Sequence, residues 1–230
     1  MYKHLLFDLD HTLWDFEANA RVTLQELHLR HELEKKGITD FDLFHKTYLA
    51  HNEKLWERYR NGQIKQQELR FKRMRLTLLD FKIADETLTN EISTAFLDLL
   101  PKRTLLFPYA KEILQYLVDK GYVLHLVTNG FEATQHSKLD SSGLKKYFTE
   151  IITSESSNSL KPHKEIFEFA FQRCCAKPEE CIMIGDSFEA DILGAMSAGI
   201  DQVHVNFENK PTPVKPTYTI HALKELELIF

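Results

Sequence analysis

The chain has few of the residues that define several common protein classes. Its 230 residues include three cysteines, and two of them, Cys174 and Cys175, are adjacent. Together with Cys181 they form neither a disulfide framework nor the ligand spacing of a zinc site. None of the eleven histidines belongs to an HExxH motif or a Cys/His cluster. We therefore expect reduced, structural thiols in a cytoplasmic protein.

Long apolar runs and a strong excess of charge are also missing. No segment approaches the ~20 apolar residues of a membrane span, and the N-terminus lacks the pattern of a signal peptide. A net charge of -5 offers no electrostatic reason to bind nucleic acid or an anionic membrane. We expect a monomeric globular protein whose partner is a small molecule, with no nucleic-acid polymer and no membrane.

Proline and glycine are scarce in the first part of the chain. Proline is absent before Pro101, and the only glycines before that point are Gly37 and Gly62. Between residues 16 and 100, apolar residues recur at helical spacing among many charges, which predicts consecutive helices broken at the two glycines.

From about Thr104 the pattern changes to short β-rich runs that alternate with helical segments. We expect strands at 122–128, 150–153, 181–186 and 202–206, and helices at 109–119, 131–140, 163–173 and 188–198. Alternation of this kind predicts right-handed βαβ units and a parallel sheet. A Pro-rich segment, 211–219, then leads to a last short strand and helix.

The first apolar run, LLFDL at 5–9, matches the later strands and not the helical segment that follows it. We therefore predict an α/β fold with a discontinuous core, residues 1–14 and 101–230. A helical domain, residues 15–100, is inserted after the first strand.

Polar residues gather where the expected strands end. Asp8 lies within the first apolar run and Asp10 follows two positions on, although neighbouring carboxylates repel and are costly to desolvate. The carboxyl ends of parallel strands share one edge of a sheet, where ligands bind. The other polar residues expected at this edge are Thr12, Thr128, Asn129, Lys161, Asp186 and Asp191. Singly, each of the later ones is compatible with a helix cap, a turn or a solvated side chain.

As a set, these residue types are suited to phosphoryl transfer. Asp8 and Asp186 can hold one Mg²⁺, which would compensate their charge and let a carboxylate approach an anionic phosphate. One carboxylate can act as nucleophile, while the second protonates the leaving oxygen and later activates water. Thr128 can donate a hydrogen bond to a phosphoryl oxygen, and Lys161 can neutralise charge in the transition state.

Four motifs, in order along the core, resemble the phosphatase branch of the haloacid dehalogenase superfamily: FDLDHT (7–12), VTNG (127–130), LKP (160–162) and IGDSFEAD (184–191). The resemblance implies a Rossmann-like core with a helical cap domain. It also implies Asp8 as nucleophile, Asp10 as general acid and base, and Asp191 as an accessory acid. Mg²⁺ would be held by Asp8, Asp186 and the backbone carbonyl of Asp10. Phosphate would be bound at Lys161 and at the Thr128-Asn129 turn.

Three further segments resemble phosphatases of nucleoside 5′-monophosphates: 52–64, 128–144 and 216–220. In the first, Asn52, Trp56 and Tyr59 share one helix face, where they can contact a base or sugar or pack inside a helical bundle. A basic run follows, compatible with a solvated helix face or with Arg70 reaching substrate: Lys65, Arg70, Lys72, Arg73 and Arg75.

Other functions share parts of this pattern. A phosphatase of small phosphosugars or phosphoglycolate, or a phosphosugar mutase, would keep Asp10, whereas dehalogenation of haloalkanoates needs no acid there. A receiver-like phospho-accepting module would be about half as long and would lack the helical insert. A catalytically silent interaction protein would not need the full set of catalytic residues. The sequence thus favours a Mg²⁺-dependent phosphomonoesterase, with a nucleoside 5′-monophosphate as the leading substrate.

Overall fold

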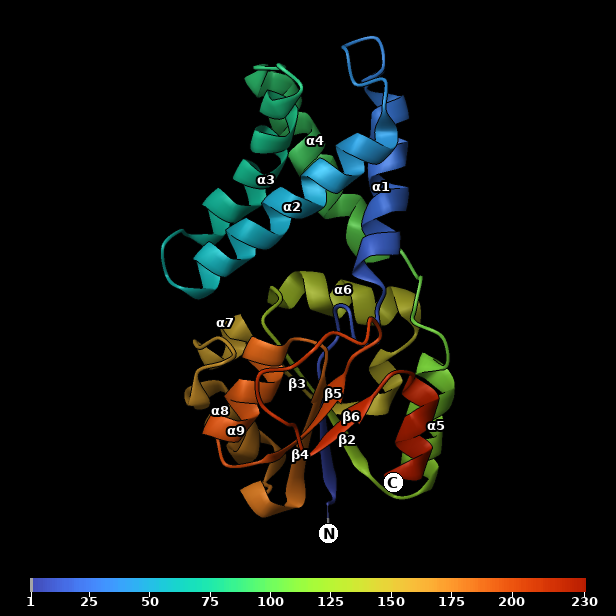
Figure 1. Ribbon diagram of the computed structural model, residues 1–230, viewed down its shortest axis with the longest axis vertical. Helices are drawn as coiled ribbons and strands as arrows, with labels where there is room; N and C mark the ends of the chain where they lie inside the picture. The colour runs from blue at the N-terminus through green and yellow to red at the C-terminus, as the bar shows by residue number, and fades with distance from the viewer. Residues whose placement is uncertain (1) are drawn as a thin grey trace. The chain divides into compact units, whose positions relative to one another are not determined.

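The structure is a computed structural model that describes residues 2–230 (Figure 1). Its backbone contacts divide it into two compact units. The sheet unit comprises residues 2–16 and Thr104–Phe230, and the helical unit comprises Glu17–Arg103. Within the described residues, no helix is both long enough and apolar enough to cross a membrane.

The sheet unit is built on six strands, paired in parallel in the order β3-β2-β1-β4-β5-β6. Their bounds are β1 His4–Phe7, β2 Val123–Thr128, β3 Phe148–Thr153, β4 Cys181–Gly185, β5 Asp201–Val205 and β6 Tyr218–Ile220. The predicted α/β fold with a parallel sheet is confirmed. Strand β1 lies between β2 and β4, so the strand order reverses beside it, and such a switch point is where open α/β sheets bind ligands.

The first strand is shorter than predicted. It ends at Phe7 rather than Leu9, which makes Asp8 the first residue beyond the strand. The backbone N–H of Asp8 still donates to the carbonyl of Ile184 at 2.9 Å. The chain then turns tightly, because the carbonyl of Leu9 accepts from three later backbone N–H groups, those of Thr12, Leu13 and Trp14.

Helices cover both faces of the sheet (Figure 1). α5 (Ala110–Asp119) packs against β2 on one face, and α8 (Lys164–Cys174) and α9 (Gly194–Ser197) lie on the other. α6 (Glu132–Ser142) follows β2, and the short α7 (Ser154–Ser157) follows β3.

Two predicted helices differ from the structure. The segment expected as one helix at 188–198 is a π-helical turn, Phe188–Leu193, followed by the short α9. The wider turn arises because Asp191 and Ile192 both donate to the carbonyl of Ser187, at 2.8 and 3.3 Å. The last helix is a 3-10 turn, Leu223–Leu228.

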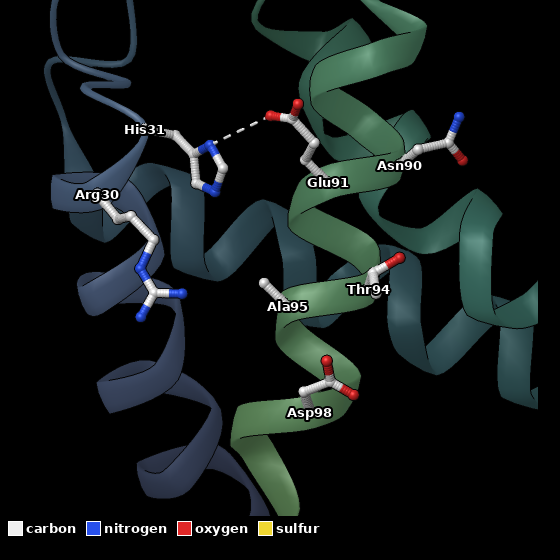
Figure 2. A pocket seen from close by; sticks show the side chains of 7 residues that line it. All are labelled: Arg30, His31, Asn90, Glu91, Thr94, Ala95 and Asp98. Carbon is white, nitrogen blue, oxygen red and sulfur yellow. Dashed lines mark ion pairs between the residues drawn. The ribbon is translucent and has the colours of Figure 1, made fainter.

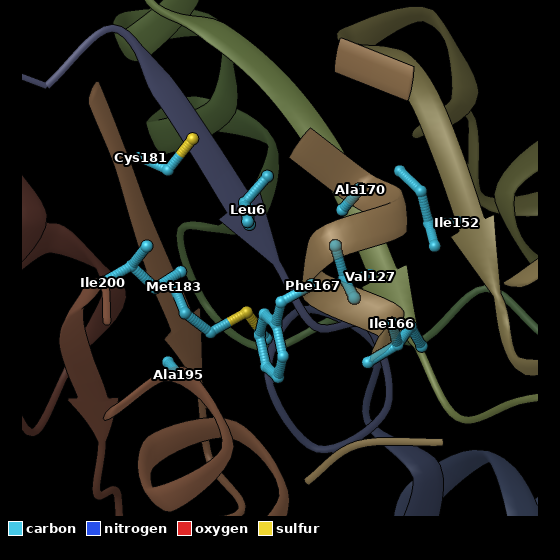
Figure 3. Packing of buried hydrophobic residues seen from close by; sticks show 10 residues of the cluster. All are labelled: Leu6, Val127, Ile152, Ile166, Phe167, Ala170, Cys181, Met183, Ala195 and Ile200. Carbon is cyan, nitrogen blue, oxygen red and sulfur yellow. The ribbon is translucent and has the colours of Figure 1, made fainter. Parts of the chain in front are cut away.

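The core between the sheet and α8 is fully apolar (Figure 3). Leu6, Val127 and Met183 from three neighbouring strands contact Phe167 and Ile166 of the helix, and all five are buried. The residues that alternate with them along the strands are buried as well, as expected for a sheet covered on both faces. This packing fixes the strand ends, and with them the polar residues that follow.

The helical unit consists of α1 (Phe16–Arg30), α2 (Phe41–Arg60), α3 (Gln66–Asp80) and α4 (Glu86–Leu99). Asp40 and Asp85 cap α2 and α4, each accepting a backbone N–H at 2.9 Å. Gly37 and Gly62 lie between helices at φ of 104° and 68°, a backbone conformation that glycine adopts without strain. The predicted breaks at both glycines are therefore present.

Candidate active site

Lys161 lies at the centre of a buried ionic cluster in the sheet unit. Its Nζ is 2.6 Å from Oδ1 of Asp8 and 2.6 Å from Oδ1 of Asp191, and it donates to the carbonyl of Val127 at 2.6 Å. Lys161 and Asp191 are each 1% exposed, and Asp8 is 8% exposed. Burial alone would lower the pKa of Lys161, but the two carboxylates outweigh it and raise that pKa, so the lysine is a fixed cation.

Asn129 holds the backbone of Lys161 in place. Its side-chain amide donates to the carbonyl of Lys161 at 2.8 Å and accepts from the backbone N–H of Lys161 at 2.7 Å. Both the oxygen and the nitrogen of this amide are therefore hydrogen-bonded to the backbone of Lys161. Phosphate binding at Asn129 stays a prediction, and its side-chain contacts add a second role, which is to position Lys161. Thr128, at the end of β2, is 2% exposed and accepts from the N–H of Gly130 at 3.1 Å.

Asp186 is attached to the loop after β1 through Thr12. The hydroxyl of Thr12 donates to Oδ1 of Asp186 at 3.0 Å and accepts from its backbone N–H at 3.1 Å. A ring nitrogen of His204 lies 3.1 Å from the backbone carbonyl of Asp186. These contacts tie the ends of β1, β4 and β5 together, although the three segments are far apart in the sequence.

Gly185 makes room for the carboxylate of Asp191. A Cβ at position 185 would lie 2.2 Å from Oδ2 of Asp191, so a side chain there would displace it. The same oxygen accepts from the backbone N–H of Ser187 at 3.0 Å. The π-helical turn and the glycine thus aim Asp191 inward, toward Lys161.

The three carboxylates can form a cation site. One oxygen from each of Asp8, Asp186 and Asp191 lies within 4.8 Å of the others. Burial, with the neighbouring carboxylates adding, raises the pKa of Asp8 well above its usual range against the opposing effect of Lys161. Burial and Asp191 raise the pKa of Asp186 to about 7.

The chemistry of this donor set fits a hard divalent cation. Lys161 alone does not compensate three adjacent carboxylates. The buried Oδ1 of Asp191 meets the Lys161 ammonium at 2.6 Å and has no other hydrogen-bond donor among residues 2–230. All available ligand atoms are carboxylate oxygens, the type that Mg²⁺ prefers.

Asp10 occupies a different environment from Asp8. Its two carboxylate oxygens accept hydrogen bonds from Lys138 at 2.5 Å and from Gln135 at 2.9 Å, both on α6. Burial acts to raise the pKa of Asp10, but Lys138 and Gln135 outweigh it and lower that pKa. The carboxylate of Asp10 is thus paired with α6, and it is not part of the three-carboxylate cluster.

Sequence reasoning missed Gln135 and Lys138 as site residues. They stand three positions apart, so they share one face of α6, which begins four residues after Thr128. That spacing was the available signal. It was weak because α6 also carries polar residues on its other faces, so nothing in the pattern marked these two as buried.

The predicted substrate residues lie in the helical unit. Asn52 is 7% exposed and accepts from Arg73 at 3.2 Å, so it faces α3. Trp56 and Tyr59 are half-buried and meet edge to face at 5.7 Å, and Arg70 is half-buried. We interpreted the basic run as compatible with a solvated face. Arg73 is an exception, because it is 5% exposed and its guanidinium lies over the ring of Phe96.

A hollow of about 480 Å³ opens between α1 and α4 of the helical unit (Figure 2). Figure 2 shows His31 turned toward Glu91, and the two groups are 3.8 Å apart. None of the predicted site residues lines this hollow.

Comparison with known proteins identifies the class. The family model of haloacid dehalogenase-like hydrolases matches residues 2–199. The chain therefore belongs to this family, as its four motifs predicted, and it is an enzyme of the hydrolase type.

Individual relatives match over nearly the whole chain. The chain is 33% identical to pyrimidine 5′-nucleotidase PynA of Streptococcus pneumoniae, covering 98% of this chain and 93% of that protein. It is 30% identical to pyrimidine 5′-nucleotidase YjjG of Escherichia coli, covering 97% and 95%. The magnesium-bound crystal structure of the putative HAD-hydrolase YfnB of Bacillus subtilis matches with a TM-score of 0.88 and 30% identity, covering 99% of this chain and 98% of that one.

Proposed function

We propose that the protein is a Mg²⁺-dependent phosphomonoesterase that hydrolyses nucleoside 5′-monophosphates through an aspartyl-phosphate. The arrangement of Asp8 and Asp186, directly after β1 and β4, around Lys161 in the loop between α7 and α8 carries this proposal. A buried carboxylate beside a fixed cation is suited to attack phosphorus, because the cation offsets the charge of the approaching phosphate.

In the first step, an oxygen of Asp8 attacks phosphorus while the bond from phosphorus to the ester oxygen breaks. The electron pair of that bond goes to the leaving oxygen, which takes a proton from Asp10, so this step uses Asp10 in its protonated form. Lys161 balances the charge on the phosphoryl oxygens, and the hydroxyl of Thr128 donates to one of them.

In the second step, Asp10 takes a proton from water as the water oxygen attacks phosphorus. The bond between phosphorus and Asp8 breaks, which releases phosphate and regenerates the carboxylate. The lowered pKa of Asp10 supports this base role, because it keeps the carboxylate ionised and able to accept the proton.

Asp8 and Asp186 are the proposed ligands of Mg²⁺, joined by the backbone carbonyl of Asp10, with Asp191 supporting the site. The ion supplies Lewis-acid polarisation of the phosphoryl group and shields the nucleophile from the phosphate charge. The clustered carboxylate oxygens and the raised pKa values of Asp8 and Asp186 support this assignment, since the Lys161 ammonium is shared between Asp8 and Asp191 and leaves the cluster with excess negative charge.

The substrate assignment rests on the two pyrimidine nucleotidases that match the chain over nearly its full length. The helical unit is the proposed cap domain. Within it, Trp56 and Tyr59 offer aromatic surface for a base, and Arg70 offers a cation. The proposed partner is a small phosphorylated metabolite.

A phosphate-release panel tests the proposal. We expect the highest kcat/KM for pyrimidine nucleoside 5′-monophosphates, lower values for purine ones, and the lowest for glyceraldehyde 3-phosphate and phosphoglycolate. Chelation should abolish turnover, and added Mg²⁺ should restore it. A preference for the sugar phosphate would overturn the substrate assignment. Full activity in the presence of chelator would overturn the metal assignment.

A further inference from the structure

Asp10 is bound on both of its carboxylate oxygens by side chains of a single helix. Lys138 Nζ donates to Oδ1 at 2.5 Å, and Gln135 Nε2 donates to Oδ2 at 2.9 Å. An ionised carboxylate has about four acceptor positions, so each oxygen keeps one free for a proton in transfer. Two donors on different oxygens also fix the plane of the carboxylate, which one donor does not.

Lys138 is built into this position. It is 2% exposed, and its ammonium lies 4.2 Å from the ring centre of Trp14 and 5.8 Å from that of Phe16. Asp10 is its one carboxylate partner within residues 2–230. A buried ammonium requires compensation, and the aromatic faces supply part of it. The remainder comes from Asp10, so the two charges hold each other in place.

Gln135 is placed by a glycine. A Cβ at position 130 would lie 1.7 Å from Gln135 Nε2, so the side chain of Gln135 occupies space that only glycine leaves open. Gln135 is 1% exposed, and its Oε1 is buried without a hydrogen-bond donor among the described residues. The contact with Asp10 therefore sets the orientation of this amide.

We propose that Lys138 and Gln135 are the positioning residues of Asp10, a role that rests on the proposed phosphatase function. They hold the carboxylate in one orientation while it gives a proton to the leaving oxygen and then takes one from water. Misplacement of a catalytic group by about 1 Å can cost ~10²-fold in rate. Their removal should therefore act on proton transfer more than on substrate binding.

Single-turnover release of the leaving group tests this with Lys138→Met and Gln135→Met, which remove each donor at similar length. For an alkyl phosphate, whose leaving oxygen needs a proton, we expect the rate to fall ~10–100-fold with KM within about threefold of wild type. For an aryl phosphate with an acidic phenol, phenol release should fall only a few-fold. Lys138→Arg, which keeps the cation, should recover part of the loss.

Ser142→Ala is the matched control, because Ser142 lies on the same helix and donates to the backbone carbonyl of Lys138 at 2.6 Å without contacting Asp10. It should lower thermal stability and leave the ratio of alkyl to aryl rates unchanged. Equal losses on both esters in Lys138→Met and Gln135→Met, or a loss confined to stability, would overturn the positioning role.

Crystal structures of wild type and Lys138→Met separate this inference from the proposed function. We expect the Asp10 carboxylate to leave its wild-type orientation in the variant. An unchanged carboxylate in Lys138→Met would contradict the positioning role, whether or not the wild type hydrolyses phosphate esters. A wild type that hydrolyses no phosphate ester would contradict only the phosphatase proposal.

Discussion

Two aspartates only two positions apart lie in opposite electrostatic surroundings. Asp8 shares Lys161 with a second carboxylate, and burial raises its pKa. Asp10 has Lys138 to itself and a second donor in Gln135, and its pKa is lowered. Carboxylates in contrasting environments can take different roles in catalysis. The lowered pKa of Asp10 suits its proposed role as the base of the second step, whereas Asp8 would need the added positive charge of the proposed Mg²⁺ to be ionised as a nucleophile.

Substitution of the two aspartates should separate these roles. Asp8→Asn should abolish turnover of every ester, because an amide is a poor nucleophile. Asp10→Ala should reduce turnover of an alkyl phosphate by ~10²–10⁴, the range for lost acid-base catalysis. With an aryl phosphate it should give a burst of phenol near one equivalent, with phosphate retained on Asp8. Rapid steady turnover of both esters by Asp10→Ala would contradict the mechanism.

The strands carry a second group of polar residues in their first halves, away from the site. His4 on β1 and His125 on β2 are stacked with ring centres 5.3 Å apart, and Nδ1 of His4 lies 3.0 Å from Nε2 of His125. Burial and the neighbouring His4 lower the pKa of His125 to about 4, while Glu150 on β3 has the opposite effect. Folding therefore keeps His125 neutral at pH values where the unfolded chain protonates it.

The stability of the sheet unit should fall as the pH drops from about 6.5, the value for an unfolded histidine, toward the pKa of about 4 in the folded state. In this window the unfolded chain binds more protons, so its stability relative to the folded chain increases as the pH falls. The loss from His125 should approach ~3 kcal/mol at the acid limit, and it should be absent above pH ~7.

Urea unfolding at a series of pH values measures this effect. His125→Asn should flatten the decline between pH ~6.5 and ~4. His163→Gln, at an exposed histidine, should keep the wild-type slope. An unchanged slope in His125→Asn would exclude this residue as the source.

At the scale of the whole molecule, the reaction and its specificity are proposed to come from different units. The ionic cluster lies entirely in the sheet unit, and the aromatic pair Trp56 and Tyr59 lies in the helical unit. One fold can serve enzymes with many different substrates. We therefore propose that substrate choice depends on the helical unit.

Trp56→Ala tests that division. If Trp56 stacks on a base, kcat/KM for nucleotides should fall by an amount equivalent to ~1–3 kcal/mol, with little change for a minimal phosphate ester. Phe44→Leu, at a fully buried position on the same helix, should lower thermal stability without selective loss on nucleotides. Equal losses on both substrates in Trp56→Ala would assign Trp56 a packing role instead.

The sequence by itself determined the class of the fold and the residues at the strand ends. Strand and helix periodicity depend on neighbours in the chain, so the alternation after residue 104 was sufficient to predict a parallel sheet. Parallel strands place their carboxyl ends at one edge, so Asp8, Thr128 and Asp186 could be expected together before any contact was known.

Only the tertiary structure decided how those residues are paired. Lys138 and Asp10 are 128 positions apart, and Lys161 and Asp8 are 153 apart. The local sequence pattern carries no information about such partners, because the residues around a buried lysine on a polar helix are of the same types as those around a solvated lysine. The pairing follows from the packing of α6 and of the loop that carries Lys161 in the sheet unit, where each buried charge depends on a specific counter-charge.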